Sequence, residues 1–331
     1  MSIVSNLLGN DTKLTLQIYS GGRIQEPAVL EGITWETARK GEPGKLSFTV
    51  IKDDSLSFSE GAEVAVRYGD TNVFFGYVFE KQRNKDHHIQ VTAYDQIRYL
   101  KAKTTYVLYG IRADQVVKRI AEDFKLRTGT LENTGFIIPT LDCPNQTVLD
   151  TILDAIDLTV MNTGQLFYLY DDFGRLTLKN ITSSKTDLLI NGSTAEDFDY
   201  TTSIDSNTYN RILLVTKSDN DGAGVPTVAQ DLTNIGRWGV LQHYEEVQNG
   251  ENAAAKAKAL LKLHNKVFRN LTVKNHLGDI RVRAGSGVYL DLNLGDMIAK
   301  QHMLVEKATH YFNNGHHTMD LTLNGNEEFY G

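Results

Sequence analysis

The sequence predicts an α+β protein that is mainly β. Apolar and polar residues alternate near both ends of the chain, which is the period of half-buried strands. Glycine-rich turns separate these alternating runs. In between, residues 113–162 change to apolar spacings of three and four, the period of amphipathic helices. With 331 residues, the chain can hold two or three domains of about 100–200 residues. We place them at 1–102, 103–205 and 206–331.

The first segment, residues 1–102, is predicted to contain five or six short strands. Leu14, Leu16 and Ile18 share one face of the first strand. Further alternating runs cover residues 46–50, 64–68, 73–79 and 89–93, with Gly21-Gly22, Gly41 to Gly44, Gly61 and Gly69-Asp70 as turns. Strands at this spacing indicate a small closed barrel or a sandwich.

The middle segment, residues 103–205, is predicted to be a small α+β unit. Its two helices lie near 113–126 and 146–162, and Thr147 with Asp150 can cap the second one. A β-hairpin follows at 165–180, where Asp171 to Gly174 supply the Asp and Gly typical of a tight connection. Two helices beside a hairpin are typical of an α+β arrangement.

The last segment, residues 206–331, returns to strands and carries an inserted helix near 251–268. One side of this helix is mostly alanine, and a neighbouring side carries Lys258, Lys262, Lys266 and Arg269. A basic amphipathic helix can bind a membrane surface or an acidic partner. The alanine-rich apolar face favours a simpler interpretation, a surface helix of a globular domain with one solvated side.

The charge balance excludes some classes of partner. Lys and Arg total 34 against 41 Asp and Glu, a net charge of −7, which argues against a generic nucleic-acid binder. The acid excess lies almost entirely in residues 103–205, which hold 9 basic and 15 acidic side chains. This surplus repels anions at short range, although solubility is the more economical explanation.

Cysteine usage and hydropathy set further limits. The single cysteine, Cys143, excludes an intrachain disulfide and a thiolate metal cluster, and is expected to be a small buried apolar residue. The first residues lack a basic start followed by a long apolar run, and no 18 apolar residues run together. We therefore expect neither a classical export signal nor a membrane span.

The search for catalytic and metal-binding motifs returns mostly absences. Zinc-protease, P-loop, nucleophile-elbow and CxxC patterns are missing. GSGVYL at 285–290 lacks the third glycine of a dinucleotide loop, and Asp219 to Gly222 fails as a calcium loop at Ala223. GSGVYL leads into a strand rather than the helix that such a loop requires, and Asp219 to Gly222 is expected to be a surface turn.

Clustered histidines and carboxylates leave two weaker hypotheses. His302, His310, His316 and His317 could suggest a metal site. However, adjacent side chains on a strand point to opposite faces, so structural histidines are favoured. The acid pairs Asp171/Asp172 and Asp197/Asp199 could flank a glycosidic bond, although a turn role is favoured for the first pair. We therefore assign no catalytic, cofactor-binding or metal residue and expect no enzyme.

Two stretches of the sequence carry a similar order of features. Residues 60–94 and 294–324 each open with Gly beside an acid and continue with an alternating strand. Each then has an apolar strand, an Asn-containing turn, a His pair and a final alternating strand. This similarity suggests that the first and last domains are the same barrel used twice.

The junction AYDQIRYL at 93–100 and the hairpin YLYDDFGRLTLKN at 168–180 carry a family resemblance. They resemble baseplate hub proteins of contractile phage tails, particularly those of defective prophages and phage-tail-like bacteriocins, which are distantly similar to the late control D proteins. The resemblance implies two tail-tube-like β-barrel domains in each subunit, separated by the small α+β domain. It also implies a homotrimer that closes a ring with pseudo-six-fold symmetry around a channel.

The implied function is a structural hub, a symmetry adapter that connects the hexameric tail tube to the trimeric central spike. Expected partners are the tail tube protein, the central spike protein, and tape-measure and baseplate wedge proteins, with no cofactor, specific nucleic acid or membrane span. The expected location is a virion or tail-like particle made in the bacterial cytoplasm. Since the sequence ends at Gly331, just after the last strand, no lytic domain is expected. The alternatives are a cell-wall-degrading tail enzyme and a host-surface binding module of the same particle.

Overall fold

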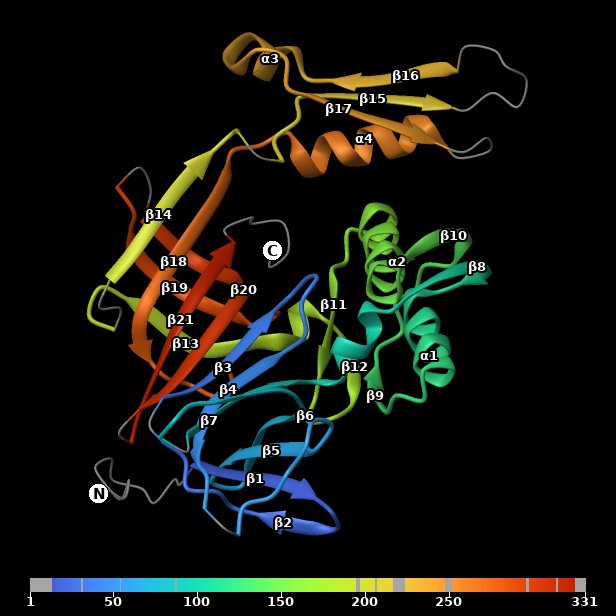
Figure 1. Ribbon diagram of the computed structural model, residues 1–331. Helices are drawn as coiled ribbons and strands as arrows, with labels where there is room; N and C mark the ends of the chain where they lie inside the picture. Colours follow the sequence, from blue (N-terminus) through green and yellow to red (C-terminus); the bar gives the residue numbers. More distant parts are fainter. Residues whose placement is uncertain are drawn as a thin grey trace. The chain divides into compact units, whose positions relative to one another are not determined.

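The computed structural model describes residues 14–30, 32–53, 55–86, 88–194, 197–205, 207–216, 224–247, 252–295, 298–313 and 315–324 (Figure 1). The chain forms two compact units. The larger one contains the chain up to Thr159, Gln165–Asp199 and the chain from Leu271 onward, and the smaller one contains Val160–Gly164 and Tyr200–Asn270. The expected turn at Asp219 to Gly222 lies outside the described residues.

A 13-stranded sheet forms the centre of the larger unit. Its first half comprises β1 (Leu14–Ser20), β2 (Arg23–Gln25), β3 (Ile33–Ala38), β4 (Lys45–Ile51), β5 (Glu63–Tyr68), β6 (Thr71–Arg83) and β7 (His88–Tyr94). Its second half comprises β13 (Lys185–Asn191), β14 (Asp197–Ser203), β18 (Phe268–Leu277), β19 (Gly287–Asn293), β20 (Ile298–Asn313) and β21 (His316–Asn324). The protein is therefore mainly β, as the sequence predicts.

The two halves of this sheet follow the same strand order. The first half runs β3-β4-β7-β6-β5-β1, and the second runs β14-β18-β21-β20-β19-β13. In both halves, the strands also follow one another along the chain in the same order, so that β1, β3, β4, β5, β6 and β7 correspond to β13, β14, β18, β19, β20 and β21. The first strands differ in direction, because β1 is antiparallel to β5 whereas β13 is parallel to β19.

The halves join where β3 pairs antiparallel with Lys307–Phe312 of β20. This pairing corrects the expectation of a closed barrel in residues 1–102. Among the described strands, the pairing path stays open at β2 and β14, because the free edge of β3 is taken by the second half. Figure 1 shows β3 and β4 beside β20 at the centre of this unit.

Strand alternation places the expected apolar residues in the core. Leu46, Phe48 and Val50 of β4 are buried, as are Ile89 and Val91 of β7. Their polar neighbours along each strand are half-buried or exposed, so one face of each strand supplies the core. Burial of such side chains is worth about 1.5–3 kcal/mol each, which makes them the main source of stability in this half.

The middle of the chain supplies a smaller set of elements. They are the 3-10 helix η1 (Gln96–Lys101), β8 (Lys103–Ile111), α1 (Ala113–Asp123), β9 (Thr128–Leu131), β10 (Ile138–Thr147), α2 (Val148–Thr163), β11 (Phe167–Asp171), β12 (Leu176–Asn180) and the 3-10 helix η2 (Ile181–Ser184). The hairpin β11-β12 and both helices are present close to their expected positions. The pairing of β8 with β10 and of β12 with β9 was not expected.

The smaller unit has a sheet of its own. Its elements are β15 (Arg211–Thr216), β16 (Val225–Gln230), α3 (Leu232–Trp238), β17 (Gln242–Val247) and α4 (Ala253–His264), with strand order β16-β15-β17. Ala257 and Leu260 of α4 pack against Ile212 and Leu214. The alanine-rich face of α4 is therefore a core face, as favoured from the sequence. Residues 211–216, expected among the strands of the last barrel, belong to this separate sheet.

Within the part of the chain that the structure describes, no helix is both long and apolar enough to cross a membrane.

Candidate functional site at the seam between the two halves

The repeat is visible in matching backbone hydrogen bonds. Gly61 and Gly285 both adopt a positive φ, 84° and 92°. The Gly61 amide donates to the Val78 carbonyl at 2.7 Å, and the Gly285 amide donates to the Val305 carbonyl at 2.8 Å. The return bonds also match, because the amide of each valine donates to the carbonyl of the residue after each glycine, at 2.9 Å in both copies.

Matching β-bulges fix the alignment of the two copies. The β6-β7 ladder shifts register between Val78 and Glu80, and the β20-β21 ladder shifts between Val305 and Lys307. Residues 61–94 therefore correspond to residues 285–324. From the sequence alone, the second copy was expected to begin at residue 294, which is too late in the chain. GSGVYL at 285–290 is its true beginning, and the glycine there serves a positive-φ turn before β19.

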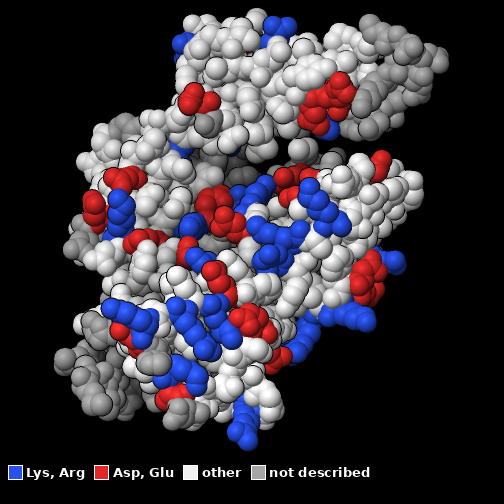
Figure 2. Space-filling model, viewed as in Figure 1, with Lys and Arg blue, Asp and Glu red and all other residues white. Residues whose placement is uncertain are grey.

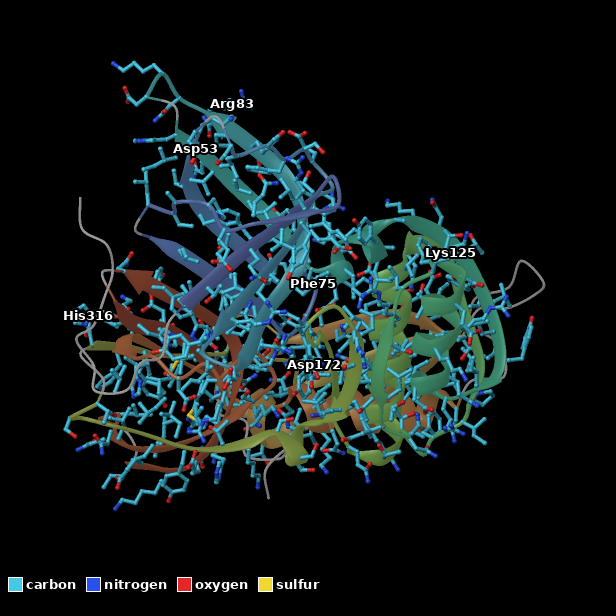
Figure 3. All side chains as sticks on the ribbon, turned by 90° about the horizontal axis from the view of Figure 1, so that it is seen from below. Asp53, Phe75, Arg83, Lys125, Asp172 and His316 are labelled. Carbon is cyan, nitrogen blue, oxygen red and sulfur yellow. The ribbon has the colours of Figure 1, made fainter. Side chains whose placement is uncertain are left out.

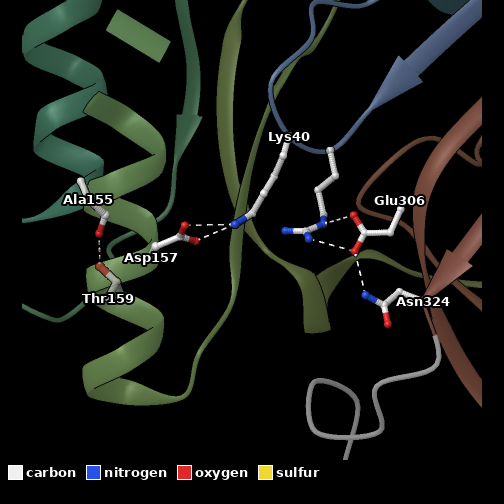
Figure 4. A network of polar contacts seen from close by, with 7 residues as sticks. Lys40, Ala155, Asp157, Thr159, Glu306 and Asn324 are labelled. Carbon is white, nitrogen blue, oxygen red and sulfur yellow. Dashed lines mark hydrogen bonds and ion pairs between the residues drawn. The ribbon is translucent and has the colours of Figure 1, made fainter. Parts of the chain in front are cut away.

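We call the contact between β3 and Lys307–Phe312 of β20 the seam, because the two halves join there. Paired side chains hold it together as well as the backbone hydrogen bonds of the two strands. Trp35 stacks on His310 with ring centroids 4.8 Å apart. The Arg39 guanidinium donates two hydrogen bonds to the Glu306 carboxylate, at 2.7 and 2.8 Å, and Asn324 donates a further one at 3.3 Å (Figure 4). Glu306 is the bulged residue itself, so the bulge aims its carboxylate at the neighbouring half.

A second set of ion pairs lines the solvent side of the seam. Burial alone would raise the pKa of Glu36, but hydrogen bonds and the positive charges of Lys45 and Lys307 hold that pKa below its ordinary value. These three residues, with Arg98 and Lys101, line an open pocket of about 400 Å³. Figure 2 shows basic and acidic side chains interspersed over the visible face of this unit rather than gathered by sign.

The seam also explains two of the four candidate histidines. His310 and His317 share a hydrogen bond of 2.9 Å between their rings, and His310 contacts the Val282 carbonyl at 2.9 Å. Burial lowers the pKa of His310 to about 3 and that of His317 to about 4, so both rings are neutral at pH 7. His316 is exposed, which confirms that the adjacent histidines face opposite sides. Among the described residues, no group of three metal-binding side chains is assembled.

Two buried aspartates connect the middle elements to both halves of the sheet. Asp95, from the AYDQIRYL junction, accepts hydrogen bonds from the amides of Gly44 at 2.8 Å and Ile97 at 3.0 Å. Asp171, from the DDFG turn, accepts one from the Gly174 amide at 2.6 Å. Arg283, which precedes the second copy, donates to the Asp171 backbone carbonyl at 2.9 Å.

Burial sets the protonation of both aspartates. It raises the pKa of Asp171 to about 6, and burial together with the nearby Asp171 raises the pKa of Asp95. The same turn contacts β6 through Phe173, whose ring centroid lies 5.6 Å from that of Phe75. The two motifs that carry the family resemblance therefore form one structural joint.

The geometry does not favour hydrolysis at either acid pair. Asp171 is only 5% exposed, so its carboxylate is inaccessible to a sugar polymer. Asp199 is exposed on β14 and forms an ion pair with Lys274. Cys143 is buried, as predicted, and burial raises its pKa to about 11, which keeps the thiol protonated and unreactive at pH 7.

Solved structures show where this fold occurs. A 43 kDa tail protein of prophage MuSo2 from Shewanella oneidensis matches with a TM-score of 0.68 at 14% identity, over 95% of this chain and 99% of that one. A tail protein from Neisseria meningitidis MC58 matches with a TM-score of 0.69 at 14% identity, over 96% and 98%. The Escherichia coli c3393 protein, a type VI secretion component described as structurally similar to T4 tail proteins gp27 and gp5, gives 0.57 at 10% identity, over 95% and 78%. The fold is therefore one that phage tail proteins adopt.

Sequence comparison identifies the family. The phage-like element PBSX protein XkdQ of Bacillus subtilis strain 168 is 31% identical over 305 residues, which cover 89% of this chain and 92% of that protein. The protein YqbQ of the same strain is 29% identical over the same coverage. A family model described as YQBQ-like matches residues 33–324, so this chain belongs to the YQBQ-like family.

Proposed function

We propose that this protein is a structural hub in the baseplate of a phage tail or tail-like particle, where three copies connect the hexameric tail tube to the trimeric central spike. The observation that carries this proposal is the repeated strand order of the large sheet. A chain with two equivalent halves presents six equivalent units when three copies form a ring, and still has three-fold symmetry elsewhere.

The seam supports the proposal, because the two equivalent halves of one chain are already joined side by side there. β3 of one half pairs with β20 of the other, so neighbouring units share one continuous sheet. The two tube-like domains would then be residues 14–94 and the strands β13, β14 and β18 to β21. The first is continuous, whereas the second is interrupted by the smaller unit between β14 and β18.

The names of related proteins agree with this role. XkdQ is a protein of a phage-like element, and two structures with the same fold are tail proteins of prophage or bacterial origin. The partners we propose are the tube protein, the spike protein and a second and third copy of this chain. Tape-measure and baseplate wedge proteins would contact the same hub.

Quantification of this protein in purified particles tests the proposal. Particles from a strain that carries the gene should contain this chain at half the copy number of a single tube ring. Deletion of the gene should yield particles that lack a joined tube and spike. Recovery of the chain only in the unassembled fraction would contradict the proposal. A cleared band on a peptidoglycan gel would favour the cell-wall-degrading alternative instead.

A further inference from the structure

We propose that the edge of β14 in one copy pairs antiparallel with residues 80–83 of β6 in a second copy. This inference rests on the proposed ring and names the contact that closes it. It repeats between chains the pairing that β3 and β20 make within the chain.

The strand order of the two halves dictates which edges would meet. β20 occupies in the second half the position that β6 occupies in the first, and β14 occupies the position of β3. The matched bulges align Lys307 with Glu80 and His310 with Arg83. Since β20 accepts β3 along Lys307–Phe312, the corresponding acceptor in the first half starts at Glu80.

Both edges are open among the strands that the structure describes. β6 pairs with β7 from Tyr77 to Arg83 on one side, whereas its pairing with β5 on the other side ends at Tyr77. β14 is the last strand of the sheet path on the second-half side. Figure 3 shows Arg83 at a projecting end of the first half, well away from the seam.

The side chains of β14 have the exposure of an unpaired edge strand. Most of its residues are exposed on both faces, and Phe198 is 36% exposed. An exposed edge strand is a template for pairing with another chain, and monomeric proteins usually protect such edges. The aspartates of β14 disfavour pairing with another strand unless that strand carries basic side chains opposite them.

The edge of β6 has that complementary charge. Its end carries the exposed Arg83, while β14 carries Asp197 and Asp199; the neighbouring Lys81 is already paired with Glu60 within the chain. Opposite charges across neighbouring strands stabilise a pairing. At the equivalent position inside the chain, His310 is buried under Trp35 and uncharged. The contact between copies would therefore be the more polar of the two seams.

A cysteine scan tests both the contact and its direction. In a Cys143→Ser background, Gln82→Cys is combined in turn with a cysteine at each exposed position of β14, namely Asp197, Phe198, Asp199, Thr201 and Thr202. Because side chains alternate between the faces of a strand, disulfide-linked oligomers should form at every second position. Replacing Gln82→Cys by Glu80→Cys should move the best partner two residues toward the end of β14, since antiparallel pairing reverses the direction.

The purified chain and the assembled particle are both assayed on non-reducing gels. The matched control combines Gln82→Cys with Glu122→Cys, an exposed position on α1, and should give no linked oligomer. Linkage without alternation, or none at all in particles that retain the chain, would overturn this inference and leave the hub proposal standing. Linkage of Gln82→Cys to a different particle protein would assign this edge to that protein. Absence of the chain from particles would contradict the hub proposal itself, and linkage in the purified chain would then still report the pairing.

Discussion

The two halves of the large sheet share a backbone plan but differ in what covers their edges. In both, a positive-φ glycine leads into a strand whose neighbour bulges after a valine. In the second half, β3 covers the edge of β20, and Trp35, Arg39 and Glu306 close the contact. In the first half, the corresponding edge ends in the exposed Arg83. The repeat is therefore preserved in turns and bulges, while the side chains have adapted to different neighbours.

The largest effect should come from a methyl group added at the second glycine. At Gly285, a new Cβ would lie 2.2 Å from Cδ2 of Tyr168, a buried ring that shares a hydrogen bond with Ser184. At Gly61, nothing lies within 4 Å of a new Cβ. We expect Gly285→Ala to lower the free energy of unfolding by about 3 kcal/mol or more, and Gly61→Ala by about 1 kcal/mol from the backbone conformation alone.

Urea denaturation of both variants measures this difference. The two glycines have similar φ values, so each variant serves as the backbone control for the other. Equal losses at the two positions would show that backbone strain, and not the contact with Tyr168, makes glycine necessary in the second half.

The seam provides the next prediction. Arg39→Ala leaves the Glu306 carboxylate, 24% exposed, without its main partner, and should lower the free energy of unfolding by about 2 kcal/mol. Lys40→Ala removes the neighbouring but solvent-exposed ion pair with Asp157 and should cost less than about 0.5 kcal/mol. In a Glu306→Ala background, Arg39→Ala should have a much smaller effect. Comparable losses for Arg39→Ala and Lys40→Ala would mean that the seam adds nothing beyond a surface contact.

The sequence predicted local structure better than it predicted pairing. Alternation located β4 and β7, and helical spacing located α1 and α2, because these patterns depend on which face of each element is buried. β3 was missed, since only six residues form it and its role depends on β20, far away in the chain. The closed barrel was wrong for the same reason.

The candidate site was also predicted in its local segments but not in the contacts between them. The sequence indicated the AYDQIRYL junction and the DDFG turn, but nothing in their spacing placed Asp95 and Asp171 in one buried joint. The repeat was noticed, yet its start was misplaced because Gly295 beside its acid was matched to Gly61, whereas Gly295 lies in the turn before β20 as Gly69 lies in the turn before β6. The glycine of GSGVYL was a usable signal, since Gly61 precedes β5 in the same way.

The last prediction uses pH to separate the buried histidines of the second half from the buried Asp171 in the middle of the chain. The unfolded chain binds protons at His310 and His317 below their ordinary pKa of 6.5, whereas the folded chain does so only near pH 3 and pH 4. These residues therefore make the free energy of unfolding fall as the pH drops from 6.5 toward 4. Asp171 opposes this trend. Its folded pKa of about 6 lies above its ordinary 3.8, so its contribution is fully present below pH 3.8 and is lost as the pH rises through 6.

Substitution of each group should change the slope in opposite directions. Asp171→Asn removes the opposing contribution, so the free energy of unfolding should fall more steeply between pH 6 and 4, by on the order of 1 kcal/mol per pH unit. His317→Gln should make the same slope shallower. Asp172→Asn, one residue away in the exposed part of the turn, is the matched control and should change the slope far less. Urea titrations at pH 4.5, 5.5 and 6.5 measure all three. An unchanged slope in His317→Gln would mean that the histidine pair does not stay neutral in the folded second half.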